Sequence, residues 1–367
     1  MTGFLCAFNR DEALLDNNIF DNRLDSVRDV GRDGCWRHSV HSWLAMGECV
    51  RRDTPEVPLK PRACQSNDCT LVGDIRLDNR NELVSVLELR PAEISDNELL
   101  MAAYCRWGTD CVDHIFGEFS FVLWDDRKQR LFAARDPMGE RAFYLARLGS
   151  QLVLSNEIRI PRSWPGISGR LDEVSVVGAL VRRGMFMRSA TRTFFEGVEQ
   201  LPPGHFLIAT KDNIQTQRYW SIIGLEDQPL PHASRNEMLE DFRSMMEDAV
   251  VKRLRSVRAV GCHLSGGLDS STVAALAASQ LQKSNDNLHC FSHWTRAQIS
   301  DISKTRTVRE EAYVEAIIDR FPNIISHQAY GDERSLLGDV VTQFHYNGTV
   351  HPNHYQTWWD EISAKAS

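Results

Sequence analysis

The sequence lacks a long hydrophobic run: nowhere do its 367 residues approach the roughly eighteen consecutive apolar positions of a membrane helix. It also lacks a basic excess, since 42 Lys and Arg face 50 Asp and Glu, and a net charge of -8 offers nucleic acid no complementary surface. The first ten residues hold an apolar stretch too short for the core of a secretion signal. We therefore expect a cytoplasmic protein that binds neither membrane nor nucleic acid.

The cysteines form no recognisable metal site. The chain has nine, and an odd count without a secretion signal suits a reducing compartment. Cys64 and Cys69, and likewise Cys105 and Cys111, lack the spacing of metal ligands. We expect these four to be structural thiols.

The length indicates two domains, because 367 residues exceed what one hydrophobic core usually fills. Residues 1–225 are rich in predicted strands. Apolar segments at 115–124 and 130–134 flank the charged run DDRK, as in a hairpin, and residues 143–145 and 151–155 repeat this pattern. The first domain is therefore predicted to be built on antiparallel sheets.

Helical signals occur in both halves. Ser95 precedes a predicted helix over 96–107, with Glu98 at the capping-box position. Polar residues and prolines predict a linker at 226–236. Residues 237–253 then carry apolar side chains at helical spacing, and we expect this stripe to pack into the core of the second domain.

The second domain, residues 237–367, is organised around the loop LSGGLDSS at 264–271. A predicted strand, 257–264, leads into the loop, an alanine-rich helix over 272–281 follows, and residues 288–292 are predicted to be the next parallel strand. Two adjacent glycines allow a close backbone approach, so that N–H groups can converge on anionic oxygens at a helix N-terminus. The loop is predicted to hold a pyrophosphate group.

The acidic residue of this loop indicates a metal. Asp269 would repel a bare phosphate, so its presence favours a bridging Mg²⁺. The loop has neither the lysine and spacing of a Walker motif nor the G-x-G-x-x-G of a dinucleotide site. An ordinary serine- and glycine-rich turn before a helix is the alternative interpretation.

The S-G-G-x-D-S stretch resembles the loop of the ATP pyrophosphatases, which split ATP into AMP and pyrophosphate while activating a carboxylate or similar group. The resemblance implies ATP and Mg²⁺ as cofactors, with Asp269 as the metal ligand. It also implies that backbone near Leu264 and Phe291 flanks the adenine. The ATP-binding residues implied are Leu264, Ser265, Gly266, Gly267, Asp269, Ser270, Ser271 and Phe291.

Further motifs extend the resemblance over almost the whole chain. In order they are GEFSFVLWD, ARDPMG, SNEI, LPPGH and YW, at 117–125, 134–139, 155–158, 201–205 and 219–220. With the loop, they resemble the glutamine-hydrolysing asparagine synthetases. This family implies an α+β, Ntn-hydrolase-like antiparallel sandwich, here the class II glutamine amidotransferase-like residues 1–225. An α/β parallel-sheet ATP-pyrophosphatase domain of the adenine nucleotide α-hydrolase type would follow at 237–367.

The glutaminase chemistry of this family uses a cysteine directly after the initiator methionine, and here that position is Thr2. Cys6 is not terminal and cannot replace it. In the family's substrate-holding stretch, Val72 stands where an asparagine amide would face the oxyanion. Asp96 matches the acidic residue of the family's Ser-Asp pair, a remnant of glutamine binding. We expect an inactive glutaminase half, with a threonine nucleophile as the alternative.

The degenerate first half resembles that of the β-lactam synthetases and the lasso-peptide macrocyclases, in which an internal amine attacks the activated carboxylate. The substrate is therefore expected to be a small-molecule or peptide carboxylate, with aspartate and a peptide both open. Later family motifs are absent, so the second domain is expected to be incomplete, as a fragment, as half of a pair with a second polypeptide, or as an inactive scaffold. A homodimer also stays open.

Overall fold

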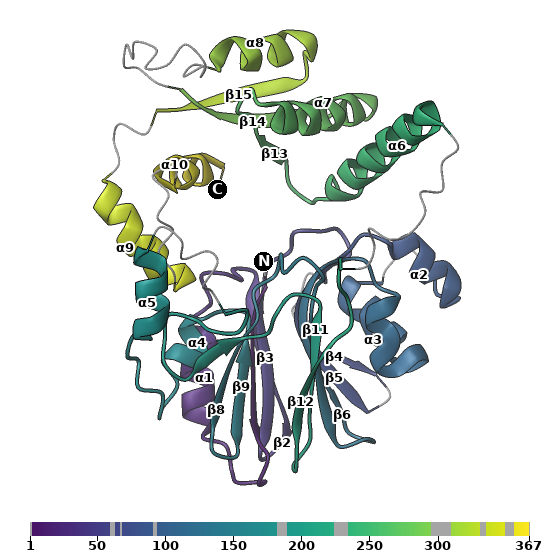
Figure 1. Ribbon diagram of the computed structural model, residues 1–367. Helices are drawn as coiled ribbons and strands as arrows, with labels where there is room; N and C mark the ends of the chain where they lie inside the picture. The colour runs from purple at the N-terminus through teal and green to yellow at the C-terminus, as the bar shows by residue number, and fades with distance from the viewer. Residues whose placement is uncertain are drawn as a thin grey trace. The chain divides into compact units, whose positions relative to one another are not determined.

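Two antiparallel sheets and one parallel sheet organise the chain in the computed structural model (Figure 1). The structure describes residues 2–58, 63–66, 68–90, 94–181, 189–223, 234–294, 310–330, 335–348 and 356–366. The chain divides into two compact units, residues 1–228 with 344–349 and residues 229–343 with 350–367. Most of the predicted linker, 226–236, lies outside the described residues.

The first unit contains two six-stranded sheets, each made entirely of antiparallel pairs. One sheet has the order β10 (Val198–Gln200), β8 (Tyr144–Leu148), β9 (Gln151–Ser155), β1 (Gly3–Asn9), β3 (Leu44–Val50) and β2 (Gly34–His41). The other has the order β12 (Ile214–Arg218), β11 (His205–Ala209), β7 (Arg130–Arg135), β6 (Gly117–Asp125), β5 (Cys69–Leu77) and β4 (Cys64–Ser66). Both predicted hairpins are confirmed, as β6–β7 and β8–β9.

Alternation along the strands sorts the side chains into layers. The fully buried Phe4, Met46 and Val122 belong to the core between the two sheets, because alternate residues of a strand point to opposite faces. Helices cover the outer faces: α1 (Asn17–Asp25) and α4 (Arg159–Arg162) on the first sheet, α3 (Asp96–Trp107) on the second. The other helices among the described residues of this unit are α2 (Arg80–Val86), η1 (Gly108–Asp113) and α5 (Glu173–Leu180).

The predicted capping box of α3 is confirmed. The Ser95 hydroxyl accepts a hydrogen bond from the Glu98 N–H at 3.2 Å, and the Glu98 carboxylate accepts one from the Ser95 N–H at 2.8 Å. Two donors of the first helical turn are thereby satisfied.

The second unit contains a three-stranded parallel sheet in the order β13 (Val260–His263), β14 (Leu288–His293) and β15 (Ile324–Ala329). Its described helices are α6 (Arg235–Arg253), α7 (Leu268–Lys283), α8 (Glu311–Arg320) and α10 (Gln356–Ala366). The helix α9 (Leu336–Asn347) begins in this unit, and its residues from 344 onward are assigned to the first unit. An antiparallel sandwich followed by a parallel α/β sheet confirms the fold class expected for both halves.

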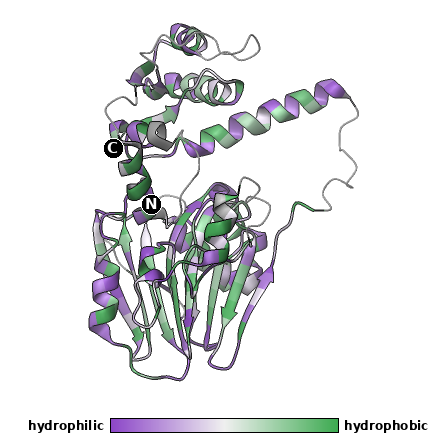
Figure 2. Cartoon of the chain, turned by 60° about the vertical axis from the view of Figure 1, so that its left-hand side comes forward, coloured by the Kyte–Doolittle hydropathy of each residue, from purple (hydrophilic) through white to green (hydrophobic). Residues whose placement is uncertain are grey.

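The apolar stripe of α6 contradicts the prediction that it packs into a core. Met238, Leu239, Phe242 and Met245 are 39%, 54%, 62% and 70% exposed. Near the end of the helix, Val250 is buried against α7 and its neighbours. Figure 2 shows hydrophobic and hydrophilic residues alternating along this helix. The prediction was wrong because helical spacing identifies an apolar face but not whether a second layer covers it.

The cysteines are partly as expected. Cys64, Cys69, Cys105 and Cys111 form no disulfide among the described residues, as expected for thiols. The cysteine count did not predict the disulfide between residues 35 and 49, which are cross-strand neighbours on β2 and β3. No helix in the described part of the chain has the length and hydropathy to cross a membrane.

Candidate functional site

The predicted nucleotide loop lies between β13 and α7. Leu264 is buried directly after β13, and its N–H donates to the carbonyl of Phe291 at 2.9 Å, which extends the pairing of β13 with β14. Ser265, Gly266 and Gly267 then turn the chain, and α7 begins at the next residue. The loop therefore follows the carboxyl end of a parallel strand, where open α/β sheets bind ligands.

Gly266 is the residue that this turn requires. Its φ of +80° lies in the left-handed region that favours glycine. A Cβ added here would lie 2.7 Å from the carbonyl oxygen of Glu310, directly before α8. A side chain at this position would push two backbone segments apart.

The loop serines bond to one another. The Ser270 hydroxyl accepts from the Ser265 N–H at 3.1 Å, and the two hydroxyl oxygens are 3.0 Å apart. Gly267 is the N-cap of α7 and provides no side-chain cap, while the Ser271 N–H is used within the helix, on the Gly267 carbonyl. An uncapped helix N-terminus with two hydroxyls beside it is suited to anionic oxygens.

Asp269 lies in the first turn of α7 and is exposed. No group of three or more His, Cys, Asp or Glu residues in the described ranges has the geometry to hold a metal ion. One carboxylate suits Mg²⁺ that takes its other ligands from phosphate oxygens and water, because magnesium retains waters readily. Phe291 is 6% exposed, and its ring stacks on His327 with centroids 4.6 Å apart.

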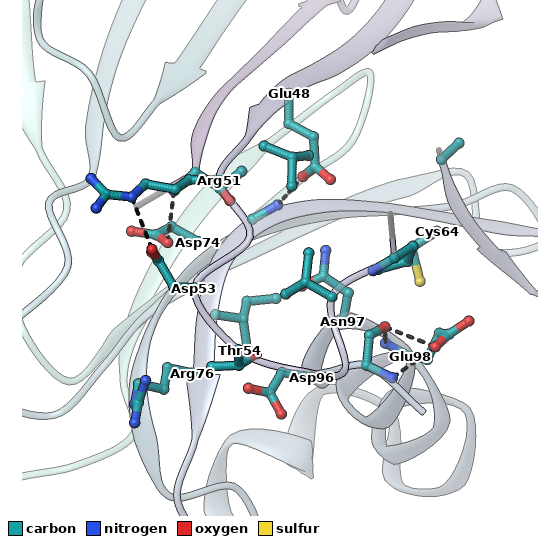
Figure 3. A pocket seen from close by; sticks show the side chains of 18 of the residues that line it. Glu48, Arg51, Asp53, Thr54, Cys64, Asp74, Arg76, Asp96, Asn97 and Glu98 are labelled. Carbon is teal, nitrogen blue, oxygen red and sulfur yellow. Dashed lines mark hydrogen bonds and ion pairs between the residues drawn. The ribbon is translucent and has the colours of Figure 1, made fainter. Parts of the chain in front are cut away.

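A cavity of about 480 Å³ lies in the first unit, where sequence reasoning placed the glutaminase remnant. Many of its lining side chains are charged, and Figure 3 shows Asp74 beside the ion pair of Arg51 and Asp53, with Asp96 apart from them. Thr2 also lines it.

Thr2 is held by its backbone. Its N–H donates to Asp74 Oδ1 at 3.0 Å, and its carbonyl accepts from the Asn156 side chain at 2.7 Å. The other oxygen of Asp74 pairs with Arg141 at 3.1 Å, and the same guanidinium pairs with Glu118 at 3.0 Å. Removal of Met1 would place an α-ammonium group against a carboxylate already paired with an arginine.

The remaining residues predicted from the glutaminase resemblance are separated. Asp96 lines the cavity, but its carboxylate accepts from the Arg80 guanidinium and from the Leu77 N–H at 3.2 Å. Val72 lies in the core between the sheets, and so does Cys6, where burial raises the pKa of the thiol. A thiol of this kind is a poor nucleophile.

Sequence reasoning missed Glu48, which lines the same cavity. Its carboxylate accepts from the Gly73 N–H and from the Trp36 indole N–H, both at 3.1 Å. Burial raises its pKa to about 8. The available signal was a single acidic residue inside the otherwise apolar segment LAMGECV.

Two family models match the chain. The model described as a glutamine amidotransferase domain covers residues 52–220, and the model described as asparagine synthase covers residues 241–336. The two matches therefore fall on the two halves that carry the cavity and the loop.

Three relatives illustrate the similarity. The chain is 32% identical over 243 residues to asparagine synthetase [glutamine-hydrolyzing] 3 of Bacillus subtilis, which is 64% of the chain and 38% of that protein. It is 31% identical over 223 residues to amidase chyE of Penicillium rubens (58% of the chain, 32% of that protein). It is 34% identical over 185 residues to amidase chry2 of Gibberella zeae (50% and 26%).

The chain thus spans well under half the length of each of these relatives. The similarity nevertheless extends over both halves, since the two models match one after the other. With these two domains in succession, the chain is a divergent member of the asparagine synthetase family.

Proposed function

We propose that the chain provides the ATP-binding loop of an amide ligase that adenylates a carboxylate. A carboxylate oxygen would attack the α-phosphorus of ATP with release of pyrophosphate, and an amine would then attack the acyl carbon and release AMP. The observation that carries this proposal is Gly266, whose positive φ and close approach to Glu310 leave room for backbone but for no side chain.

The roles of the loop residues follow from their positions. The N–H groups at the start of α7 and the hydroxyls of Ser265 and Ser270 would bind phosphate oxygens, exchanging their present contacts with each other for contacts with the nucleotide. Asp269 would hold Mg²⁺, which neutralises phosphate charge when bound. Leu264 and Phe291, joined by their backbone hydrogen bond, would border the adenine.

Calorimetric titration of the chain with MgATP tests the loop. Gly266→Ala is expected to weaken binding at least tenfold, since the added methyl group meets a backbone carbonyl. Gly178→Ala is the matched control, because its methyl group meets no atom within 4 Å. Asp269→Asn is expected to reduce the magnesium dependence of binding, and Asp319→Asn on α8 is not. Equal MgATP affinities in the Gly266 and Gly178 variants would refute the proposal.

We propose further that the first unit does not hydrolyse glutamine. Thr2 stands at the nucleophile position, Asp74 is paired with Arg141, and Asp96 is paired with Arg80. Neither carboxylate is left to receive the α-ammonium group of glutamine without breaking an ion pair. Ammonia release from glutamine by the purified chain, lost in Thr2→Ala, would show the opposite.

The carboxylate substrate is proposed to be aspartate or a peptide side chain. A dead glutaminase half favours a peptide, because an internal amine then replaces ammonia as the nucleophile. ATP–pyrophosphate exchange measured with aspartate and with a carboxylate-bearing peptide separates the two. Exchange with neither, alongside intact ATP binding, would favour the alternative of an inactive nucleotide-binding scaffold.

The exposed stripe of α6 supports a further proposal, that additional polypeptide covers this helix, either a second chain or another copy of this one. Four large apolar side chains on one helix face are a surface that soluble proteins usually cover. Sedimentation of the chain alone tests the homodimer. A dimer at high concentration that Phe242→Glu abolishes would support the homodimer, and a chain that stays monomeric at high concentration would leave a second polypeptide as the occupant.

The site of action is proposed to be the cytoplasm, where ATP is available. The disulfide between residues 35 and 49 is the feature of the structure that this proposal must accommodate. Alkylation of free thiols in intact producing cells, followed by peptide mapping, tests whether residues 35 and 49 are bonded to each other inside the cell. Mature protein recovered only from outside the cytoplasm would refute the proposal.

A further inference from the structure

Two free cysteines face each other beneath the nucleotide loop. Cys262 on β13 and Cys290 on β14 are register partners in the parallel sheet, and their sulfur atoms are 3.5 Å apart. Both belong to the group of free cysteines. Cys290 is fully buried, whereas Cys262 is half-buried on a strand with a single described partner strand.

The pair is directly connected to the loop. Cys262 lies two residues before Leu264, whose N–H donates to the carbonyl of Phe291, the residue after Cys290. The two strands that carry the sulfur atoms are therefore also joined by the hydrogen bond of Leu264, the residue directly before the turn of the loop. A change in the spacing of the sulfurs would be transmitted to the loop over two residues.

The geometry permits a covalent bond between the sulfurs. A disulfide needs a sulfur–sulfur distance of about 2.0 Å and Cα atoms about 4.4 to 6.8 Å apart. Neighbouring strands lie about 4.8 Å apart, so the backbone spacing is suitable. The sulfurs must approach by about 1.5 Å, which requires rotation of the side chains and adjustment of the strand ends.

We propose that Cys262 and Cys290 form an oxidation site, at which a peroxide converts the two thiols into a reversible disulfide that displaces the nucleotide loop. The Cys262 thiolate attacks one peroxide oxygen, the O–O bond breaks, and the thiol becomes a sulfenic acid with release of one water or alcohol. The Cys290 sulfur then attacks the Cys262 sulfur, the S–O bond breaks, and a water leaves with the Cys290 proton. The two thiols lose two electrons to the peroxide, and a thiol reductant restores them.

The order of these steps follows from exposure and hydrogen bonding. Cys262 is the more accessible sulfur, so the oxidant reaches it first. A hydrogen bond from the Cys290 thiol lowers the pKa of Cys262, which favours its thiolate. Cys290 is the resolving residue, already in contact with the site of attack.

The consequence for ATP rests on the proposed function of the loop. Displacement of the Leu264 backbone would disturb the N–H groups proposed to bind phosphate, and we expect the affinity for MgATP to fall on the order of tenfold. Reduction with dithiothreitol should restore it.

Peptide mapping by mass spectrometry tests the bond itself. After treatment of the chain with hydrogen peroxide and alkylation of free thiols, peptides containing residues 262 and 290 should be recovered linked, and dithiothreitol should release them. Cys290→Ser should leave Cys262 as a sulfenic acid that dimedone labels, and Cys105→Ser, at an exposed cysteine, should leave the linkage unchanged. Hydrogen exchange of residues 264–270 should accelerate in the oxidised chain and not in the reduced one.

Recovery of both cysteines as free thiols, at a peroxide dose that oxidises Cys105, would overturn the inference without any variant. A disulfide that leaves exchange of the loop amides unchanged would overturn it as well. If the linkage and the exchange change both occur while the reduced chain binds no ATP, the oxidation site stands and the proposed function fails.

Discussion

Glu48 keeps a carboxyl group inside the first unit, and burial raises its pKa from 4.5 to about 8. Between these values the native state retains a proton that the unfolded state has lost. The free energy of unfolding should therefore fall as the pH rises from about 4.5 to about 8, by on the order of 1 kcal/mol per pH unit.

Glu48→Gln removes this titration and should flatten the decline. Urea unfolding measured at pH 5 and pH 8 gives the slope for each protein, with the exposed Glu12→Gln as the control. A residual slope is expected from Glu157, whose pKa burial raises to about 7. Equal slopes in the Glu48 variant and the parent would contradict the assignment.

Asp136 is an example of a motif residue whose role is structural. It is 1% exposed, and one carboxylate oxygen accepts from the N–H groups of Met138 and Glu140 at 3.1 and 3.0 Å. The other accepts from Arg141 N–H at 3.0 Å. Asp136→Asn would turn an NH₂ group toward N–H donors and should lower the free energy of unfolding by about 2 kcal/mol. Urea unfolding, with the exposed Asp212→Asn as control, checks this, and equal losses would contradict it.

The residues that sequence could predict are those whose partners lie nearby in the chain. Ser95 and Glu98 of the capping box are three positions apart, and the glycine turn at 266 is built from its own backbone. The pairing of Asp96 with Arg80 and the contact of Glu48 with Gly73 join residues 16 and 25 positions apart. Such contacts depend on which strands and helices become neighbours, and a single sequence does not encode that locally.

At the scale of the element, α6 shows that apolar residues at helical spacing are not necessarily buried. Phe242 is 62% exposed, whereas Val250 on the same helix is 9% exposed and contacts the core around α7. Phe242→Gln should change the free energy of unfolding of the second unit by less than about 0.5 kcal/mol. Val250→Ala should cost about 1 to 2 kcal/mol, because it leaves space in a packed core.

Thermal or urea unfolding, monitored by hydrogen exchange in residues 234–294, measures the change in the free energy of unfolding for both variants. A loss in Phe242→Gln as large as that in Val250→Ala would mean that α6 is covered in solution. If Phe242→Gln loses this much stability only at high protein concentration, the chain associates through the stripe.

At the scale of the whole molecule, the order of motifs along the chain predicted the order of folds. Short strands with charged turns specified antiparallel pairing in the first unit, and a strand, a glycine turn and an alanine-rich helix specified the parallel unit. The set of residues that line the cavity was not predictable in the same way. Its wall collects residues from β3, β4, β5 and α3, from the segment between β3 and β4, and from Thr2 before β1 and Arg141 between β7 and β8. The sequence distributes these over more than 130 positions.

The proposed functions of the two units predict different responses to two ligands. MgATP should slow hydrogen exchange in residues 260–283, because a ligand that binds only the native state stabilises it, by about 2.7 kcal/mol at a concentration a hundred times its dissociation constant. Glutamine should leave exchange in residues 48–54 and 73–77 unchanged, because Asp74 and Asp96 already hold Arg141 and Arg80. Arg80→Ala would release one carboxylate, so a gain of glutamine protection in that variant alone would show that the ion pair closes the pocket. Protection by glutamine in the parent chain would instead mean that the first unit has kept its amino-acid site.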